Sequence, residues 1–372
     1  MLNYKKILLI NPYIKLDREN PIAILDMAPY FRKCGIEVDV CNFPDLPEFK
    51  DYDMIGISCI SSEGGYIFEQ LKVIREHFRG KKIVIGGKWS TTMTEEEALK
   101  LQTLNIEVET GKGELVYTND KVINFEKYPS WDKNDFEILC ANNIMMTSRG
   151  CPFHCNFCNN TEEKVSYFTA KRTVDNLELI LSKNNDVYFV DDIFVTNYEH
   201  AKAIYDECKR RKIKIENHNK FFVHLNTVND KTIKIIKLFK PKMVNVGIES
   251  GNDSMLKKMN KKTSVEKIRK NVKTLSKYTN VHGLWMVGYP YETIDTLKNS
   301  WNLMKELAPY IHSNWISHYI PLYATVGYHM AMEEGGKFNQ GIDNRHVAYI
   351  PKGLTQDILI EYRTKMMQFN NI

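Results

Sequence analysis

The chain of 372 residues has no long hydrophobic run, and none of its apolar stretches approaches the ~20 residues that a helix needs to span a bilayer. The first apolar run, Ile7–Ile10, is too short for the apolar core of a signal peptide, and no cleavage-site pattern follows it. We therefore expect no membrane association. The expected location is the cytoplasm, where cysteines stay reduced.

The chain also has no large excess of positive or negative charge. The 51 Lys and Arg residues nearly balance the 46 Asp and Glu residues, which leaves a net charge of +5. Such an interleaved balance attracts phosphates only weakly, so we expect no nucleic-acid partner. The densest basic stretches, 209–212 and 257–262, lie at expected helix ends, where they are predicted to be solvated and to complement the helix dipole.

The first third of the chain alternates between strand-like and helix-like segments. This order predicts right-handed crossovers and a doubly wound parallel sheet, which binds ligands beyond the carboxyl ends of its strands. The segments are Ile7–Ile10, Pro21–Lys33, Ile36–Val40, Met54–Ser58, Tyr66–Phe78 and Lys82–Ile85. Ser58, Ser61, Gly86 and Gly87 lie at or just after the expected carboxyl ends.

Alternation resumes after residues 122–137, which have no clear periodicity and are predicted to form a linker. Six further strand–helix units predict an incomplete (β/α)6 barrel with its chemistry at the carboxyl ends of the strands. The expected strands are Ile144–Thr147, Val187–Val190, Phe221–Leu225, Met243–Ile248, Val281–Val287 and Trp315–Ile320. We predict domains at residues 1–128 and 138–330, followed by a C-terminal extension, 331–372, with one helix.

Three of the eight cysteines lie within eight positions, as Cys151, Cys155 and Cys158. Thiolates suit zinc, copper and iron–sulfur clusters, and three ligands leave one iron of a four-iron cluster open to a substrate or cofactor. A zinc site needs a fourth ligand. His154 and Cys140 are both candidates for it, so the cysteines alone leave the metal undecided.

The spacing C-x3-C-x-aromatic-C, with Phe157 at the aromatic position, resembles the signature of the radical S-adenosylmethionine (SAM) superfamily. This resemblance implies a [4Fe–4S] cluster held by Cys151, Cys155 and Cys158, with SAM on the open iron. It further implies reductive cleavage of SAM to a 5′-deoxyadenosyl radical that abstracts hydrogen from a substrate. The cofactor supplies this chemistry, while the protein positions the reactants and excludes water.

Three strand ends extend the resemblance. In that superfamily, residues at the position of Asp191 and Asp192 receive the amino group of SAM, and Glu249 matches a strand motif near its ribose and methionine ends. The turn Gly288–Thr293, with Gly288 and Pro290, is similar to a G-x-P-x-E-T turn bordering the adenine. A helix cap, a structural ion pair and a simple turn are the respective alternatives.

The order of segments before the cysteines resembles the subfamily that joins a cobalamin-binding domain to the radical domain. It implies cobalamin as a further cofactor, with Ser58, Ser61, Gly86 and Gly87 as candidate contacts. Two features depart from that pattern. The chain has no D-x-H-x-x-G motif, and Lys88-Trp89 replaces the Pro-His that often follows the two glycines.

The resemblance implies cobalamin-dependent methyl transfer to an unactivated carbon of a small molecule or peptide, with flavodoxin or ferredoxin as electron donor. One alternative is a cobalamin-independent radical SAM enzyme that catalyses epimerisation, cyclisation or rearrangement, in which the N-terminal domain is a scaffold or a substrate platform. A second is a non-catalytic iron–sulfur protein. No residue acting on the substrate is identified, so the catalytic residues and the substrate stay open.

Overall fold

The computed structural model describes residues 4–12, 21–48, 51–59, 64–139, 142–160, 164–339 and 347–369. It divides into two compact units, Met1–Met146 with Tyr167–Asp186 and Thr147–Ser166 with Val187–Ile372. The chain therefore passes between the units three times. The domain boundaries expected at residues 128, 138 and 330 remain predictions.

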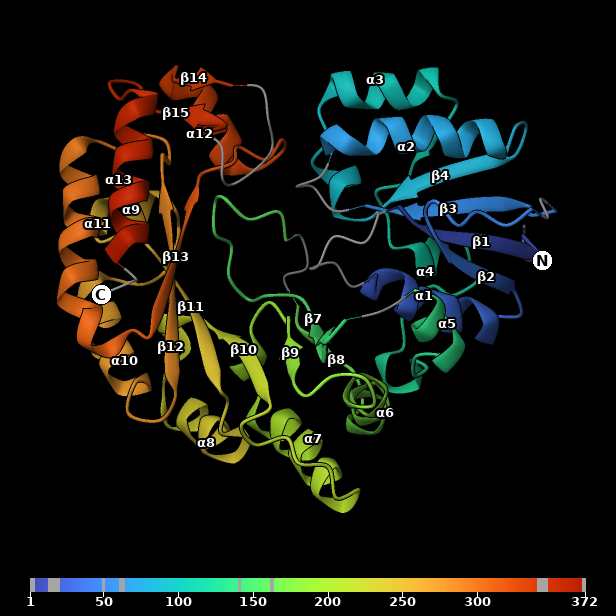
Figure 1. Ribbon diagram of the computed structural model, residues 1–372, viewed down its shortest axis with the longest axis horizontal. Coiled ribbons are helices and arrows are strands. Elements are labelled where there is room, and N and C mark those ends of the chain that lie inside the picture. The colour runs from blue at the N-terminus through green and yellow to red at the C-terminus, as the bar shows by residue number, and fades with distance from the viewer. Residues whose placement is uncertain are drawn as a thin grey trace. The chain divides into compact units, whose positions relative to one another are not determined.

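The first unit contains a five-stranded parallel sheet in the order β2-β1-β3-β4-β5 (Figure 1). The strands are β1 (Lys6–Asn11), β2 (Glu37–Asn42), β3 (Met54–Ser58), β4 (Lys82–Gly86) and β5 (Glu107–Val108). This order is that of a doubly wound fold, so the predicted fold class of the N-terminal part is confirmed. The register pairs Ser58 with Gly86, which places the last residues of β3 and β4 side by side.

Helices connect these strands and extend beyond the sheet. They are α1 (Ile22–Lys33), α2 (Gly64–His77), α3 (Glu95–Thr103), α4 (Gly113–Val116), α5 (Lys133–Ile138) and α6 (Ala170–Leu181), with short 3-10 turns η2 (Lys88–Thr91) and η3 (Phe125–Lys127). The sequence patterns missed α3 and α6. Yet α3 begins at a capping box, in which Glu97 N donates to Thr94 Oγ1 at 3.2 Å and Thr94 N donates to Glu97 Oε2 at 2.7 Å.

Residues 122–137 are not the linker that their lack of periodicity predicts. Trp131 is buried, and its indole N–H donates to Asp26 Oδ1 at 2.7 Å. Asp26 also pairs with Arg172 of α6, and both side chains are 2% exposed. The Arg172 guanidinium lies 3.7 Å from the Phe168 ring centroid. This buried ion pair, with its additional donor, ties α1, the connecting segment and α6 into one core.

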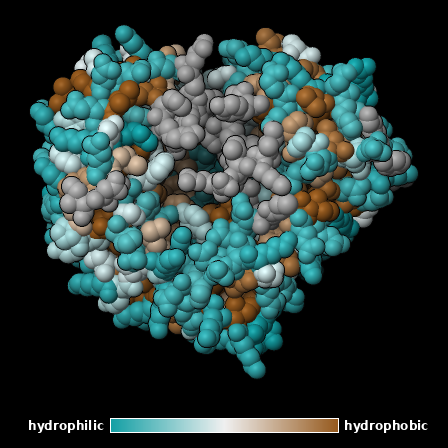
Figure 2. All heavy atoms as spheres, in the orientation of Figure 1, coloured by the Kyte–Doolittle hydropathy of each residue, from teal (hydrophilic) through white to brown (hydrophobic). Residues whose placement is uncertain are grey.

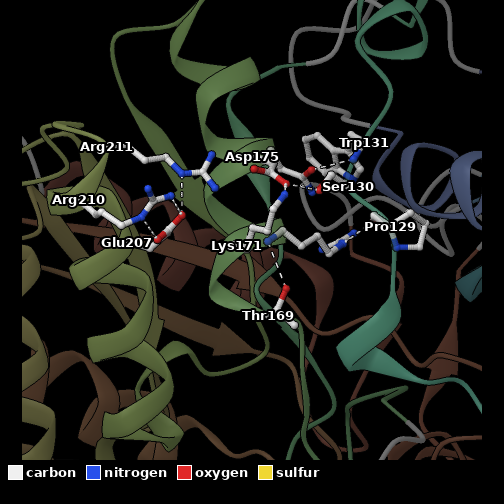
Figure 3. A network of polar contacts seen from close by, with 11 residues as sticks. Pro129, Ser130, Trp131, Thr169, Lys171, Asp175, Glu207, Arg210 and Arg211 are labelled. Carbon is white, nitrogen blue, oxygen red and sulfur yellow. Dashed lines mark hydrogen bonds and ion pairs between the residues drawn. The ribbon is translucent and has the colours of Figure 1, made fainter.

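Polar contacts continue this attachment toward the surface (Figure 3). Ser130 Oγ donates to Asp175 Oδ2 at 2.6 Å, and Lys171 Nζ lies 2.9 Å from the same oxygen. The backbone N–H of Trp131 donates to Asn176 Oδ1 at 2.8 Å. The segment 129–131 therefore follows α6 closely.

The second sheet has six strands in the order β13-β12-β11-β10-β9-β6 (Figure 1). They are β6 (Ile144–Met145), β9 (Val187–Phe189), β10 (Asn219–Val223), β11 (Met243–Glu249), β12 (Asn280–Val287) and β13 (Ser313–His318). The pairings among β9 to β13 are parallel and in chain order, so the predicted partial barrel is confirmed. Two small sheets pair β7 (Ser148–Arg149) with β8 (Ser166–Tyr167), and β14 (Lys337–Phe338) with β15 (Tyr349–Ile350).

The helices of the second unit begin just after turns that cap them. Their bounds are α7 (Tyr198–Arg210), α8 (Asp230–Phe239), α9 (Asp253–Lys258), α10 (Val265–Leu275), α11 (Ile294–Leu307), α12 (Val326–Glu334) and α13 (Gln356–Gln368). Side-chain oxygens of the capping residues accept backbone N–H groups of the first turn at Asn197, Asn229, Asn252, Ser264, Thr293, Thr325 and Thr355. These caps fix where each helix starts, and so which residues remain in the loops at the strand ends.

The basic stretch 209–212 is largely solvated, as predicted, but two of its arginines are paired. Arg210 Nη2 and Arg211 Nε each lie 2.7 Å from Glu207 Oε1 (Figure 3). Hydrogen bonds from Arg210 and Arg211 lower the pKa of Glu207 to about 2. On the face drawn in Figure 2, hydrophilic residues cover most of the surface. Among the described residues, no helix combines the length and hydrophobicity that a membrane span requires.

Candidate functional site

The three cysteines lie on one loop of the second unit, directly after β7. Gly150 has φ 101°, a conformation that favours glycine, so the chain can turn into Cys151. Cys151 and Cys155 are half-buried and Cys158 is exposed, and all three thiols are free. Within the described ranges, no three His, Cys, Asp or Glu side chains are grouped to hold a single metal ion. Cys140 lies outside those ranges, and the side chain of His154 is exposed.

Asn156, between the second cysteine and the aromatic residue, anchors this loop on both sides. Its backbone N–H donates to Met259 O at 2.9 Å, and its side-chain Nδ2 donates to Lys258 O at 2.8 Å. Its carbonyl accepts the N–H of Gly327, at the start of α12, at 2.6 Å. The loop is therefore held between the C-terminal end of α9 and the first turn of α12.

Gly327 is required by this close approach. A Cβ at that position would lie 2.6 Å from Tyr319 Oη and 2.9 Å from Asn156 O. Behind the loop lies a cluster rich in tyrosine and methionine, which also contacts Phe157. The buried members are Met255, Met259, Tyr289, Tyr319, Ala331 and Tyr349.

The two aspartates after β9 occupy different environments. Asp191 is fully buried, and its carboxylate accepts hydrogen bonds from Thr147 N at 3.0 Å, Thr147 Oγ1 at 2.8 Å and Ser148 Oγ at 2.5 Å. Burial raises the pKa of Asp191 to about 6, although these donors act in the opposite direction. Burial raises the pKa of the Cys151 thiol, and the negative charge of the half-buried Asp192 raises it further. Of the two, Asp192 is the carboxylate on the side of the cysteines.

Glu249, at the end of β11, forms a buried ion pair with Lys261. The distance from Lys261 Nζ to Glu249 Oε1 is 2.8 Å, and the residues are 7% and 9% exposed. This contradicts the expectation that the basic stretch 257–262 is wholly solvated. Glu249 has φ +61° at an irregularity in the pairing of β11 with β12, so the backbone bends where the carboxylate turns inward.

The Lys261 ammonium also faces the cysteine loop. It lies 5.5 Å from the centroid of the Phe157 ring. Burial lowers the pKa of Lys261, but the charges of Glu249 and Cys155 outweigh this, so the net pKa is raised and the side chain stays cationic. Burial raises the pKa of Cys155 to about 11, and Lys261 acts against that rise. The cation therefore favours the thiolate form of Cys155.

The turn after β12 is built around Glu292. Gly288 has φ +86°, Pro290 is buried, and Gly288 N donates to Glu292 Oε2 at 2.5 Å. Glu292 is 1% exposed, and its second oxygen, Oε1, is buried with no partner among the described residues. Burial raises the pKa of Glu292 to about 8, against the effect of the Gly288 and Tyr289 N–H groups. The buried Glu292 carboxylate therefore holds the turn that is predicted to border the adenine.

In the first unit, Ser58, Gly86 and Gly87 lie together at the carboxyl edge of the sheet, while Ser61 is outside the described residues. Gly87 has φ +92°, and a Cβ there would lie 2.4 Å from Cys59 O. Cys59 N donates to Gly86 O at 3.0 Å. The packing of β3 against β4 alone therefore requires a glycine at position 87.

Trp89 explains part of the departure from the Pro-His pattern. It is 1% exposed within the hydrophobic core of the first unit and contacts Phe68 edge to face at 5.5 Å between ring centroids. His77 ends α2, a helix that runs from the carboxyl end of β3 toward the amino end of β4. Its Nε2 lies 2.9 Å from Pro47 O. This histidine, which is the only one before residue 150, is therefore at the edge opposite Ser58.

The structure brings the cysteine loop, Phe157, Asp192, Glu249 and the glycine turn into the second unit, at or next to carboxyl ends of parallel strands. Sequence reasoning missed the residues that hold these groups, above all Asn156 and Lys261. Asn156 carried a signal, because an amide between two ligands offers donors to neighbouring backbone. Lys261 carried none, because lysines usually lie at the surface.

Comparison with known proteins decides the family. Residues 145–304 match the Radical SAM superfamily. This segment of the chain is a radical SAM domain. The match contains the cysteine loop, both aspartates, Glu249 and the glycine turn, so the resemblance inferred from their motifs is confirmed.

Two curated relatives match parts of this chain. An uncharacterized methyltransferase of Pyrococcus horikoshii is 28% identical over 170 residues, which is 44% of this chain and 37% of the relative. An uncharacterized protein of Methanocaldococcus jannaschii is 26% identical over 133 residues, or 34% of this chain and 25% of the relative. The matches thus span well under half of the length of these relatives.

Two solved structures share the fold at 16% identity. The radical SAM methyltransferase TsrM from Kitasatospora setae, with cobalamin and a [4Fe–4S] cluster bound, has a TM-score of 0.72 over 96% of this chain and 84% of TsrM. The cobalamin-dependent radical SAM enzyme OxsB, with aqua-cobalamin and SAM bound, has a TM-score of 0.69 over 88% of this chain and 55% of OxsB. These likenesses show a common arrangement of strands and helices.

The residues of the cysteine loop fit an iron–sulfur cluster. A cubane places each protein sulfur on a different iron, so the thiolates need not converge on one point. The loop is tied down by Asn156, the Asn160 N–H lies 3.4 Å from Cys158 Sγ, and Lys261 supplies a buried positive charge. N–H donors and a nearby cation are what anionic sulfur ligands require.

We predict that Glu292→Gln changes the pH dependence of stability. The folded protein keeps the Glu292 proton up to a pKa of about 8, whereas the unfolded chain loses it near the ordinary value of 4.5. Between these values, the free energy of unfolding of the wild type should fall relative to that of the variant, by at most about 1.4 kcal/mol per pH unit. Urea unfolding from pH 4 to 8 measures this, with the exposed Glu266→Gln as control. Parallel curves for wild type and Glu292→Gln would contradict the prediction.

Proposed function

We propose that this radical SAM protein reductively cleaves SAM and uses the resulting radical in cobalamin-dependent methyl transfer to an unactivated carbon of a small molecule or peptide. The anchored loop of Cys151, Cys155 and Cys158 beside a buried cation is the observation that carries the proposal. The bound cluster supplies the electron that cleaves SAM to methionine and a 5′-deoxyadenosyl radical, and cobalamin serves as the methyl carrier.

The chain's own residues hold and orient these groups. The three thiolates bind three irons, and the Asn156 hydrogen bonds keep the loop in place before the cluster arrives. A preformed loop would reduce the ordering cost of binding a cluster. Phe157 shields one side of the loop, since its ring contacts Tyr289 edge to face at 6.5 Å.

Asp192 is the group that we assign to the amino end of SAM. Its partly exposed carboxylate lies near Cys151, and a charge-assisted hydrogen bond to an ammonium is among the stronger polar contacts. Asp191 has a different role in this proposal. Its hydrogen bonds to Thr147 and Ser148 fix the strand end that leads into the cysteine loop.

The carboxyl edge of the first sheet is the proposed site for cobalamin. Ser58, Gly86 and Gly87 are small, and they leave backbone groups and one hydroxyl at that edge, where doubly wound sheets bind ligands. Because His77 lies at the opposite edge, we propose that no histidine of the first unit ligates cobalt there. Support comes from TsrM and OxsB, which carry cobalamin on this fold.

A small substrate is favoured over a macromolecule. The charged residues are interleaved and the net charge is only +5, so an electrostatic footprint for nucleic acid is weak. TsrM has also been solved with tryptophan as its substrate. Flavodoxin or ferredoxin is the proposed class of electron donor.

The first test of this function is formation of 5′-deoxyadenosine. We expect the full chain, reconstituted anaerobically with iron and sulfide, to form it from SAM and dithionite, and Cys155→Ala to lower the amount at least about 100-fold because one iron loses its ligand. Cys34→Ala, at the end of α1, is the matched control. Product analysis and the iron content per chain give the result, and a wild type that binds a cluster but leaves SAM intact would refute the enzymatic proposal.

Asp192→Asn should weaken SAM binding. Loss of a charge-assisted hydrogen bond is worth about 1.5–3 kcal/mol, which corresponds to a roughly 10- to 100-fold higher Kd. Cluster content and melting temperature should stay unchanged. Asp191→Asn should instead lower the melting temperature, because its amide cannot accept every hydrogen bond that the carboxylate accepts. Calorimetric titration of reconstituted protein with SAM separates the two, and unchanged affinity in Asp192→Asn would reject the assignment.

Corrinoid retention tests the first sheet. After incubation with hydroxocobalamin and desalting, the wild type should keep about one corrinoid per chain, read from its visible absorption. Ser58→Trp should lose it, because a bulky side chain fills the carboxyl edge, whereas Thr103→Trp, at the end of α3 and the opposite edge, should keep it. If the wild type retains no corrinoid, the cobalamin part of the proposal fails and the cobalamin-independent enzyme is favoured.

A further inference from the structure

The Glu249–Lys261 pair lies next to the cysteine loop, where its charges would act on a bound cluster. Both partners are buried, and burying an ion pair costs desolvation energy that the 2.8 Å contact only partly repays. Surface pairs of the same chain avoid that cost, as Lys171 and Asp175 do. A buried pair is therefore weak evidence for stability, and its location needs another explanation.

The backbone around the pair is shaped to admit it. A Cβ at Gly247 would lie 2.3 Å from Glu249 Oε1 and 2.7 Å from Lys261 Nζ. Glu249 and Lys262 have positive φ values of 61° and 54°, and Asn260 has 52°. Non-glycine residues rarely adopt this conformation, so Glu249 itself and both neighbours of Lys261 are strained.

The segment that carries Lys261 is bound directly to the cysteine loop. Asn260 Nδ2 donates to His154 O at 2.5 Å, and Met259 O accepts the N–H of Asn156 at 2.9 Å. Lys261 Nζ lies 5.5 Å from the ring centroid of Phe157. Phe157 lies between the second and third cysteines in the sequence. These contacts hold the ammonium against the loop while the Glu249 carboxylate keeps it there.

We propose that the Glu249–Lys261 pair sets the reduction potential of the cluster, with Lys261 as the stabilising cation and Glu249 as the residue that positions it and moderates its charge. This inference rests on the proposed function, because it requires a cluster on the three cysteines. Reduction adds one negative charge to the site. A buried cation stabilises that charge and a buried anion opposes it, and in a low-dielectric interior both effects are large.

Opposite shifts are therefore expected from the two partners. Lys261→Met should make the cluster harder to reduce, and Glu249→Gln should make it easier. Each shift should change the ratio of reduced to oxidised cluster at a fixed potential at least about tenfold, equivalent to about 59 mV for one electron. The double variant removes both charges and should return toward the wild type, which forms a double-mutant cycle.

The measurement is an anaerobic redox titration of the reconstituted full chain, followed by electron paramagnetic resonance without SAM or substrate. Lys261→Arg keeps the charge and should keep the potential. Lys262→Met removes the exposed neighbouring lysine and is the matched control. If Lys261→Met assembles too little cluster, Lys261→Gln replaces it, because its amide still donates to Glu249 while the charge is lost.

A structural role would give a different pattern. If both single variants shift the potential in the same direction, or neither shifts it, or the double variant is further from the wild type than either single variant, the inference is overturned. These outcomes differ from a failure of the proposed function. In that case the wild type itself forms no cluster signal after reconstitution, whatever residue stands at position 261.

Discussion

The cysteine loop of the second unit depends on one set of long-range hydrogen bonds, which attach it to two helices through Asn156. Its N–H and amide bind carbonyls at the end of α9, and its own carbonyl binds the first turn of α12. Because α9 ends in the turn that carries Lys261, the same attachment that places the thiols also places the buried cation. The charge and the ligands are therefore positioned by one piece of backbone, and neither can move without the other.

Local patterns predicted much of the fold, since strand runs and helix caps depend on residues that are close together in the sequence. The doubly wound sheet, the partial barrel and the cysteine motif are of this kind. Helix α6 was missed, and its place depends on a partner far away, Asp26. Lys261 was missed because its burial follows from chain reversal after α9. The resemblance also implied the same role for Asp191 and Asp192, although adjacent residues point to opposite sides of an extended chain.

Gly86 and Gly87 of the first unit show how one motif can serve both packing and the binding of a cofactor. Gly87 is required by the close approach of Cys59, whether or not a ligand binds. The following Trp89 fills the core beneath the turn. A pair of glycines after a strand therefore reports packing first. Its value as a sign of a cofactor comes from its position at the carboxyl edge, beside Ser58.

The buried contact between Asp26 and Arg172 joins residues 146 positions apart in the chain. On the ribosome, the first five strands emerge long before α6 is synthesised. During that interval Asp26 and Trp131 lack the arginine that completes their core. The cysteine loop is synthesised within this same interval. The thiols are thus synthesised before the buried ion pair that completes the core of the first unit can form.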